Sequence, residues 1–395
     1  MRLGLAVLRK NGVQEMAGDS IRISRDYEKE LQVSARAKAT IADVARLAGV
    51  STATAGRVLG GYGYASGDTK EQVLKAARAL DYRPNALARS LITGKTRTIG
   101  VVAGDIQNPF YASMIRGISD VVEQRGFGLL ITNSDERLEN ELRSVELLME
   151  KQVDGLIVSP CDTRKAQHLR ALHTAGVPLV LVDRAVAGLD VDRVAAENVG
   201  ASRAAVASLI AAGHRRIGVV AELVDQDGGG ISGFIERVFS GETVATDKLY
   251  PSWQRLLGYI QAHRAAGVPI DPGLVRRAGQ YSEDAGKRQA LDLLSMPGGP
   301  TALFTTDGTM SAGVMAAISA LNRRIPQDLS LICFDDLDWM SFLSPGITAI
   351  AQPRFAMGEV AAKLLLDRID ARDAPARSVT LAPTMIVRNS VQHGV

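Results

Sequence analysis

The 395-residue chain is poor in the residues that build metal centres, disulfides and membrane spans. It has two cysteines and five histidines, and none of them is spaced as metal ligands are. No run of about 18 apolar residues occurs, which argues against a membrane-spanning helix. The apolar run in the first ten residues is too short for a secretory signal. We therefore expect a cytoplasmic protein with free thiols at Cys161 and Cys333, no metal, no cofactor and no membrane association.

Positive charge is concentrated in the N-terminal quarter, although the net charge is only +3. Residues 1–39 contain 8 Lys/Arg and 5 Asp/Glu, residues 40–95 contain 8 and 4, and the remainder contains 30 and 34. This division is typical of a DNA-binding segment followed by a neutral or acidic sensor. Residues 1–39 read as a flexible extension or as the product of an upstream start codon, since Met16 offers a later start.

The segment 40–60 predicts a helix-turn-helix. Gly49 interrupts a helical pattern, and Ser51 can cap a second helix that packs Ala55 and Val58 inward. The apolar residues of the first helix recur at helical spacing: Ile41, Val44, Ala45 and Ala48. In this motif the second helix can enter the DNA major groove.

A third helix is expected after the Gly-rich turn at 60–67. Asp68, followed three residues later by Glu71, is a plausible capping pair. Its expected inward stripe is Val73, Leu74, Ala77 and Leu80. Three helices over 40–83 then close a small core.

The first residues of the second helix are the expected base readers. Thr52 and Ala53 lack bidentate groups, so they suit apolar contact with thymine methyls. Arg57, one turn later, can reach a guanine or a phosphate. The other expected DNA contacts in this segment are Thr40, Ser51 and Thr54.

Five further stretches occur in a characteristic order: TIADVARLAGVS at 40–51, TKEQVLKAARALDYRPNALARSL at 69–91, TIGVVAGDIQNPFYASMIRGI at 98–118, AAGHRRIGVV at 211–220 and LSLICFDDLDWMSFLSPGITAIAQP at 329–353. With them the chain resembles the lactose-repressor (LacI/GalR) family of bacterial transcription regulators from residue 40 to about residue 387. The resemblance implies an all-α DNA-binding domain joined to a two-lobed, periplasmic-binding-protein-like α/β domain with doubly wound parallel sheets.

Residues 84–96 connect the two expected domains. The stretch 85–91 has helical composition but is too short to be stable alone in water. The resemblance implies a hinge helix that orders on DNA, with Asn85 and Ala88 at the minor groove and Leu91 as a wedge between base steps. An ordinary linker is the alternative.

Two features depart from the family pattern. Ala55 and Gly56 stand where Val and Ser are usual, and Gly60 stands where Asn is common. Gly56 within a helix costs on the order of 1 kcal/mol relative to Ala, so DNA affinity is expected to depend more on the hinge. The segment 222–251 is longer than the loop usual at this place, and we expect a mobile surface loop there, with a lid or specificity loop as the alternative.

Strands alternate with helices from residue 98 onward, which predicts doubly wound parallel sheets. The expected strands are 99–103, 129–132, 155–159, 179–182, 217–221, 302–305, 329–334 and 348–351. The expected helices are 111–125, 137–151, 164–175, 200–212, 252–266, 283–295, 309–323 and 354–370. The resemblance implies two lobes within 97–395, with chain crossings near 197, 324 and 352.

Ligands of such folds bind beyond the carboxyl ends of the strands, here between the lobes. Polar and aromatic residues that follow strands are therefore the candidate effector site: Asn108, Phe110, Tyr111, Asp183, Arg184, Asp307 and Gln352. Arg255 joins them because the resemblance places an effector-binding arginine there. Carboxylate, amide, guanidinium and aromatic groups together suit a sugar or sugar derivative.

The sequence thus predicts a homodimeric repressor of a sugar transport or catabolism operon that binds a palindromic operator in double-stranded DNA and responds to a small sugar. Use of the sugar as inducer or as corepressor stays open. Two alternatives are a periplasmic-type sugar-binding protein and a dinucleotide-binding enzyme. The enzyme is suggested only by the GxGxxG of Gly228, Gly230 and Gly233, which does not directly follow a strand. No catalytic constellation is present, so an enzyme is not expected.

Overall fold

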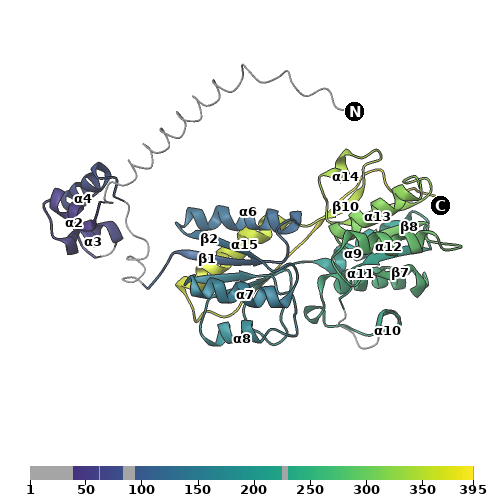
Figure 1. Ribbon diagram of the computed structural model, residues 1–395. Coiled ribbons are helices and arrows are strands. Elements are labelled where there is room, and N and C mark those ends of the chain that lie inside the picture. The colour runs from purple at the N-terminus through teal and green to yellow at the C-terminus, as the bar shows by residue number, and fades with distance from the viewer. Residues whose placement is uncertain (1–38, 62, 83–93, 225–229, 395) are drawn as a thin grey trace, which may run out of the picture. The chain divides into compact units, whose positions relative to one another are not determined.

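The computed structural model describes residues 39–61, 63–82, 94–224 and 230–394. The chain divides into two compact units, residues 1–96 and residues 97–395. The described residues of the first unit form three short helices, and the second unit contains two α/β lobes (Figure 1). Within the described ranges, no helix has the length and apolar character needed to span a bilayer.

The first unit contains α2 (Ile41–Leu47), α3 (Thr52–Gly60) and α4 (Gly67–Ala79). Thr40 and Asp43 form a capping box at the start of α2. Ser51 caps α3 as expected, because its hydroxyl accepts a hydrogen bond from the Thr54 amide at 3.1 Å. The three helices bury a small core of Val44, Ala45, Ala55, Val73, Ala76 and Ala77.

Two expectations for α4 were wrong. Ser66, not Asp68, caps this helix, since the Ser66 hydroxyl accepts from the Thr69 amide at 3.3 Å. Leu74 is 45% exposed, and Ala76 takes the inward position. Positions 73, 76, 77 and 80 share one helical face, whereas position 74 lies off that face.

The first lobe is a six-stranded parallel sheet in the order β2-β1-β3-β4-β5-β11. Its strands are β1 (Thr98–Ala103), β2 (Gly128–Asn133), β3 (Gly155–Val158), β4 (Leu179–Val182), β5 (Asp192–Ala196) and β11 (Ser378–Leu381). Its helices are α6 (Pro109–Gln124), α7 (Leu138–Glu150), α8 (Gln167–Thr174) and α15 (Arg354–Asp370). The central strands are buried, as the apolar runs of the sequence predicted.

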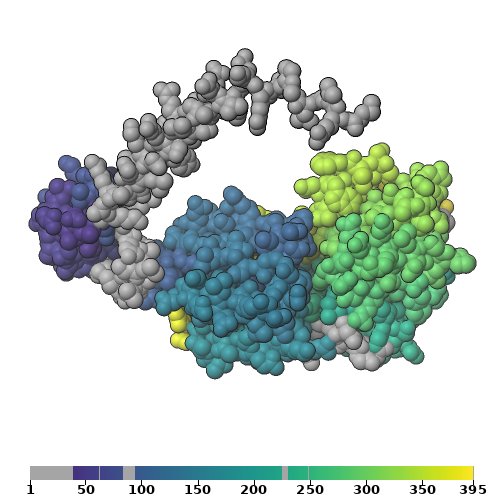
Figure 2. Space-filling view, viewed as in Figure 1, coloured from purple at the N-terminus to yellow at the C-terminus, as the bar shows by residue number. Residues whose placement is uncertain are grey.

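The second lobe repeats this plan in the order β12-β10-β9-β8-β6-β7, with only β12 antiparallel to its neighbour. Its strands are β6 (Ile217–Ala221), β7 (Val275–Arg277), β8 (Ala302–Thr305), β9 (Ser330–Phe334), β10 (Thr348–Ala351) and β12 (Thr384–Ile386). Its helices are α9 (Asn198–Ala211), α10 (Gly230–Phe239), α11 (Pro251–Ala265), α12 (Glu283–Leu294), α13 (Gly308–Ala320) and α14 (Trp339–Phe342), with 3-10 turns η1 (Thr246–Lys248) and η2 (Pro272–Leu274). Figure 2 shows the blue first lobe and the green second lobe meeting along one boundary.

The segment α15 belongs to the first lobe although it follows the second lobe in the chain. Figure 1 shows this yellow helix beside α6 and the first sheet. Its backbone approaches α6 closely at two glycines. A Cβ on Gly117 would lie 2.2 Å from the Phe355 carbonyl oxygen, and one on Gly358 would lie 2.0 Å from that of Met114. Any larger residue at either position would force the two helices apart.

The chain passes between the lobes three times. Glu197 joins β5 to α9, residues 352–353 join β10 to α15, and residues 382–383 join β11 to β12. The crossing predicted near 324 was wrong, because Arg324 lies between α13 and β9, which both belong to the second lobe. The crossing at 382–383 was missed because β11 and β12 are short and half-exposed, without an apolar run to mark them.

The expectation of a surface loop at 222–251 was wrong for residues 230–239, whereas residues 240–247 are a mostly exposed connection. Residues 230–239 form α10, in which Phe234, Ile235 and Val238 are buried in the core of the second lobe. The Phe234 ring meets the Trp253 ring edge-on at 5.0 Å between centroids. Residues 230–239 are therefore an integral part of the second lobe.

Candidate functional site

A cavity of about 730 Å³ lies between the two lobes. Its walls are formed by the segments that follow β1, β2, β3 and β4 in the first lobe and β6, β7, β8, β9 and β10 in the second. All of these are carboxyl ends of parallel strands, the edge at which open α/β sheets bind ligands. The cavity is several times larger than a water site and has room for a small organic molecule.

All eight effector residues expected from the sequence line this one cavity. They are Asn108, Phe110, Tyr111, Asp183, Arg184, Arg255, Asp307 and Gln352. The first five come from the first lobe, the next two come from the second, and Gln352 lies at a crossing between the lobes. Their role in binding stays a prediction.

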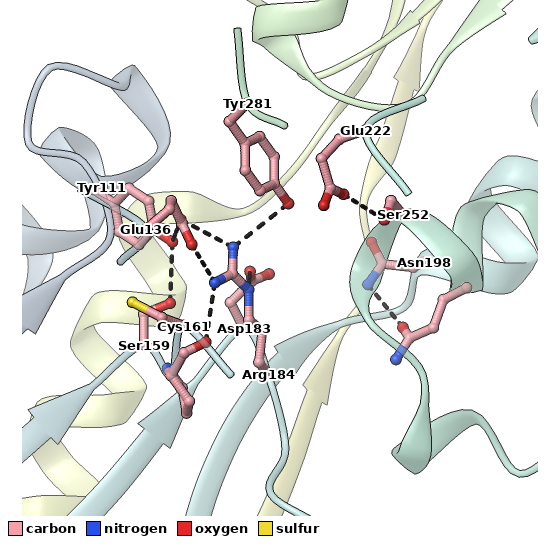
Figure 3. Close-up of polar contacts among 12 residues, drawn as sticks. Tyr111, Glu136, Ser159, Cys161, Asp183, Arg184, Asn198, Glu222, Ser252 and Tyr281 are labelled. Atoms are coloured by element: carbon pink, nitrogen blue, oxygen red, sulfur yellow. Dashed lines mark hydrogen bonds and ion pairs between the residues drawn. The ribbon is translucent and has the colours of Figure 1, made fainter. Parts of the chain in front are cut away.

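Arg184 is the polar centre of the first-lobe wall (Figure 3). Its guanidinium forms a bidentate pair with the Glu136 carboxylate and donates to the Pro160 carbonyl at 3.0 Å. It also reaches the second lobe, where Nη2 lies 3.5 Å from the Tyr281 hydroxyl and the guanidinium lies 4.7 Å from the Tyr250 ring centre. Arg184 therefore contacts both walls of the cavity.

Tyr111 extends this network into the first lobe. Its hydroxyl donates to Glu136 at 2.9 Å and lies 3.0 Å from the Ser159 hydroxyl oxygen. Burial, aided by the Glu136 carboxylate, raises the pKa of Tyr111 well above its usual value, so the phenol stays protonated. The Phe110 ring packs edge-on against Tyr111 at 5.1 Å and adds an apolar face.

Arg255 is the corresponding cation of the second lobe. Its Nε donates to the Asn198 side-chain oxygen at 2.9 Å, and Nη1 donates to the Thr306 carbonyl. The guanidinium lies 3.8 Å above the Phe334 ring centre. Its Nη2 makes no hydrogen bond to the described residues, which leaves donors for a ligand.

Asp307 and Asp335 meet at the start of α13. Asp307 caps the helix by accepting from the Met310 amide at 2.9 Å, and Asp335 accepts from the Gly308 amide at 3.1 Å. Asp335 also accepts from the Gln352 side-chain amide at 2.7 Å. Burial raises the pKa of Asp307 to about 7, and the nearby Asp335 and Glu222 carboxylates add to the rise.

Three buried polar atoms of cavity-lining residues have no hydrogen-bond partner: Asp183 Oδ1, Arg184 Nε and Gln352 Oε1. Each belongs to a residue that is less than a tenth exposed. Unpaired buried polar atoms cost free energy, so a ligand that supplies hydroxyl donors and acceptors would be stabilised here. The cavity wall thus offers a ligand two acceptors, Asp183 Oδ1 and Gln352 Oε1, and one donor, Arg184 Nε, in addition to the Arg255 guanidinium.

The structure adds cavity residues that the sequence reasoning missed. Asp335 directly follows β9, so the search for polar residues at the ends of predicted strands, the strand-end rule, could have found it. Tyr281 follows β7, a three-residue strand that carried no recognisable apolar run. Glu136 follows β2 by three residues, and Tyr250 lies in the segment that was expected to be a loop. The position of Glu136 after a predicted strand could also have marked it, whereas no signal in the sequence alone marked Tyr250.

Neutralising Asp307 is expected to stabilise the protein at high pH. Its pKa rises from 3.8 to about 7 on folding, so the native state binds the proton more tightly and loses stability as the pH increases between these values. Asp307→Asn retains an oxygen for the Met310 amide and removes the buried charge. The gain in unfolding free energy should be about 2 kcal/mol larger at pH 8 than at pH 5 in urea titrations.

Asp328, whose side chain is 28% exposed, provides the matched control. It pairs with Arg324 at 2.9 Å, and hydrogen bonds from Arg324 lower its pKa to about 2. Asp328→Asn should therefore bring no gain at pH 8. Equal effects of Asp307→Asn at both pH values would contradict a buried, proton-binding carboxyl.

In the first unit, the expected DNA contacts lie mainly on one helix. Thr52, Ala53 and Arg57 of α3 are exposed, and Arg57 Nη2 donates to the Thr54 hydroxyl at 3.2 Å. The Thr40 and Ser51 hydroxyls already form helix-capping hydrogen bonds. A contact of either hydroxyl with a DNA phosphate would be made in addition to that bond. Asn85, Ala88 and Leu91 lie outside the described residues.

The dinucleotide-binding alternative does not fit the fold. Gly228 lies outside the described residues, and Gly230 and Gly233 belong to α10. This helix begins nine residues after the end of β6, whereas the fingerprint opens a helix directly after a strand. Across the described ranges, no cluster of three His, Cys, Asp or Glu side chains is arranged to hold a metal ion.

Comparison with known proteins identifies both parts of the chain. Residues 40–85 match the model for bacterial regulatory proteins of the lacI family, and residues 206–391 match the model for a periplasmic binding protein-like domain. The match at 40–85 favours a regulator over an enzyme or a periplasmic-type sugar-binding protein.

Similar proteins include the ribose operon repressor of Escherichia coli K12, 32% identical over 89% of this chain and 99% of the relative. The repressor CytR of the same strain is 31% identical over 90% of this chain and 96% of the relative. Among solved structures, the complex of the regulator CelR with cellobiose is 29% identical, covers 89% of this chain and 99% of that one, and superposes with a TM-score of 0.63. The chain belongs to the lacI family of bacterial transcription regulators.

Proposed function

We propose that the protein represses genes for sugar transport or catabolism and that a small sugar or sugar derivative, bound between its lobes, releases it from its operator. The observation that carries this proposal is the interlobe cavity with three unpartnered buried polar atoms beside Arg255. Hydroxyl groups of a sugar supply both the donors and the acceptors that these atoms lack. Relatives named for a ribose operon and for a cellobiose complex support this ligand class.

The sugar would act by changing the relation between the lobes. Arg184 contacts Tyr281 and Tyr250 across the cavity, so a ligand among these side chains contacts both lobes. A ligand that favours one lobe arrangement shifts the population toward it. If that arrangement binds the operator less well, the operator weakens sugar binding by the same factor.

Operator recognition is assigned to residues 40–83, with α3 in the major groove and the segment 84–96 as hinge. Residues 97–395 form the effector and dimerisation domain, and residues 1–39 are an extension without a role in specificity. A regulator of chromosomal genes acts where the chromosome lies, which places the protein in the bacterial cytoplasm.

A homodimer on a palindromic operator completes the proposal. Among the described strands, the edge strand β2 pairs only with β1, and it exposes Leu130 and Ile131, the latter to 46%. An apolar edge strand is a contact surface that a second copy of the chain can cover.

Ile131→Glu is expected to convert the dimer to a monomer in sedimentation velocity and to weaken operator binding, because a carboxylate would be buried at the two-fold contact. The matched control is Val387→Glu, which changes a 71% exposed residue of the second lobe. An Ile131→Glu protein that stays dimeric would exclude β2 from the interface.

The function is tested by selection of genomic DNA fragments with the purified protein at fixed salt, with and without a panel of sugars. A short palindrome near sugar transport or catabolism genes, released by one sugar, is the expected result. If a sugar increases the amount of operator DNA that the protein retains, that sugar is a corepressor. Sequence-blind, salt-sensitive binding that no sugar changes would contradict the proposal.

A further inference from the structure

The side chains that line the interlobe cavity include more acidic than basic groups. A phosphate monoester carries close to two negative charges at neutral pH, and proteins bind it with unpaired Arg or Lys side chains or with free amides at helix N-termini. The described residues that line the cavity include seven carboxylates but only three arginines and no lysine. The balance of charge therefore opposes a phosphate.

Each of the three arginines lies near a carboxylate of the protein, which offsets its positive charge. Arg184 is paired with both oxygens of Glu136, and its Nε lies 3.6 Å from an Asp183 oxygen. Arg137 lies on the exposed rim beside Glu139. Two donors of buried arginines stay without a hydrogen bond to the described residues, Arg184 Nε and Arg255 Nη2, and each lies near a carboxylate, Asp183 for the first and Asp307 for the second.

The helix N-termini at the cavity are also occupied. At α13, the carboxylates of Asp307 and Asp335 accept from the first amides. At α6, Asn108 accepts from the Phe110 amide, and Pro109 has no amide hydrogen to offer. At α12, Ser282 provides the cap, and two acidic residues stand in the first turn. A phosphate at any of these termini would displace a side-chain acceptor or meet a like charge.

We propose that the cavity selects unphosphorylated sugars and rejects their phosphate esters. This inference rests on the proposed sugar-responsive function and specifies its ligand. The regulator then responds to the concentration of free sugar. Free sugar is supplied by a transporter that does not phosphorylate it, or by an enzyme that hydrolyses a glycoside. A kinase reaction, in which the γ-phosphoryl group of ATP replaces a sugar hydroxyl proton and ADP leaves, ends the signal.

Calorimetric titration of the full-length protein with matched pairs tests the inference: ribose and ribose 5-phosphate, glucose and glucose 6-phosphate, fructose and fructose 1-phosphate. At least one free sugar is expected to bind, with an affinity at least 100-fold above that of its ester. An ester that binds as tightly as its free sugar overturns the inference and leaves the proposed function standing. No heat with any member of the three pairs overturns both.

The variant Asp307→Asn separates charge from shape when the titrations are made at pH 8, because Asp307 is ionised above its pKa of about 7 and the substitution then removes one buried negative charge while it keeps the cap. The ratio of free-sugar to ester affinity is expected to fall about tenfold in this variant. Asp338→Asn is the control, since Asp338 is exposed and does not line the cavity, and its ratio should match that of the unchanged protein. An unchanged ratio in Asp307→Asn would assign the rejection to steric fit and overturn the electrostatic argument.

Discussion

Replacement of Arg255 by methionine is expected to weaken binding of the effector sugar by about 30-fold or more while operator binding persists. Methionine preserves an apolar stem above the Phe334 ring but removes the guanidinium donors, of which Nη2 is free for a ligand. A hydrogen bond to a charged group contributes about 1.5–3 kcal/mol, and 30-fold corresponds to about 2 kcal/mol. Calorimetry with the sugar and fluorescence anisotropy with the operator measure the two affinities.

The control for this variant lies on the same helix. Arg264 is exposed near the end of α11 and donates a 3.4 Å hydrogen bond to the Val238 carbonyl. Arg264→Met should therefore leave both affinities within about twofold. Loss of operator binding by Arg255→Met would reveal a folding defect. Unchanged sugar binding would remove Arg255 from the site.

Ala53→Glu is expected to reduce operator affinity by about 100-fold without unfolding the first unit. Ala53 is exposed in the first turn of α3, where the motif presents its residues to base edges. A glutamate at position 53 cannot make the apolar contact with a base, and its carboxylate repels the DNA phosphates. The loss of one base contact alone costs about 1–3 kcal/mol of binding free energy. Anisotropy with operator and with scrambled DNA measures the effect.

The same substitution at another exposed alanine gives the control. Ala79 is the last residue of α4, so Ala79→Glu changes the net charge equally but lies outside the recognition helix. Its operator affinity should fall by only a few fold through general electrostatics. Equal losses in the two variants would show that α3 does not lie in the groove.

The candidate cavity was predictable where the strands are continuously apolar and buried. β4, β6, β8 and β10 begin and end at the residues expected, because continuous runs such as LVLV and IGVVA can satisfy their backbone only in a buried sheet. The strand-end rule then placed Asp183, Arg184 and Asp307 at one edge. Arg255 lies on α11, and only the family resemblance pointed to it.

The missed features share a physical cause. In β7 only Val275 is buried, and β11 alternates between exposed and half-buried residues, so neither strand has a continuous apolar pattern. Because β7 and β11 were not predicted, neither Tyr281, which follows β7, nor the crossing at 382–383, which follows β11, was predicted. The pairing of Glu136 with Arg184 joins residues 48 positions apart, and such tertiary contacts leave no local signal.

The late position of α15 and β11 sets the order in which the protein can mature on the ribosome. Met357, Ala361 and Leu365 of α15 are fully buried in the first lobe, whose other strands were synthesised more than 150 residues earlier. The nascent first lobe therefore waits with an open core while the second lobe emerges. A chain that ends before residue 354 contains the three helices of the first unit but lacks α15 and β11, so the core of its first lobe stays incomplete.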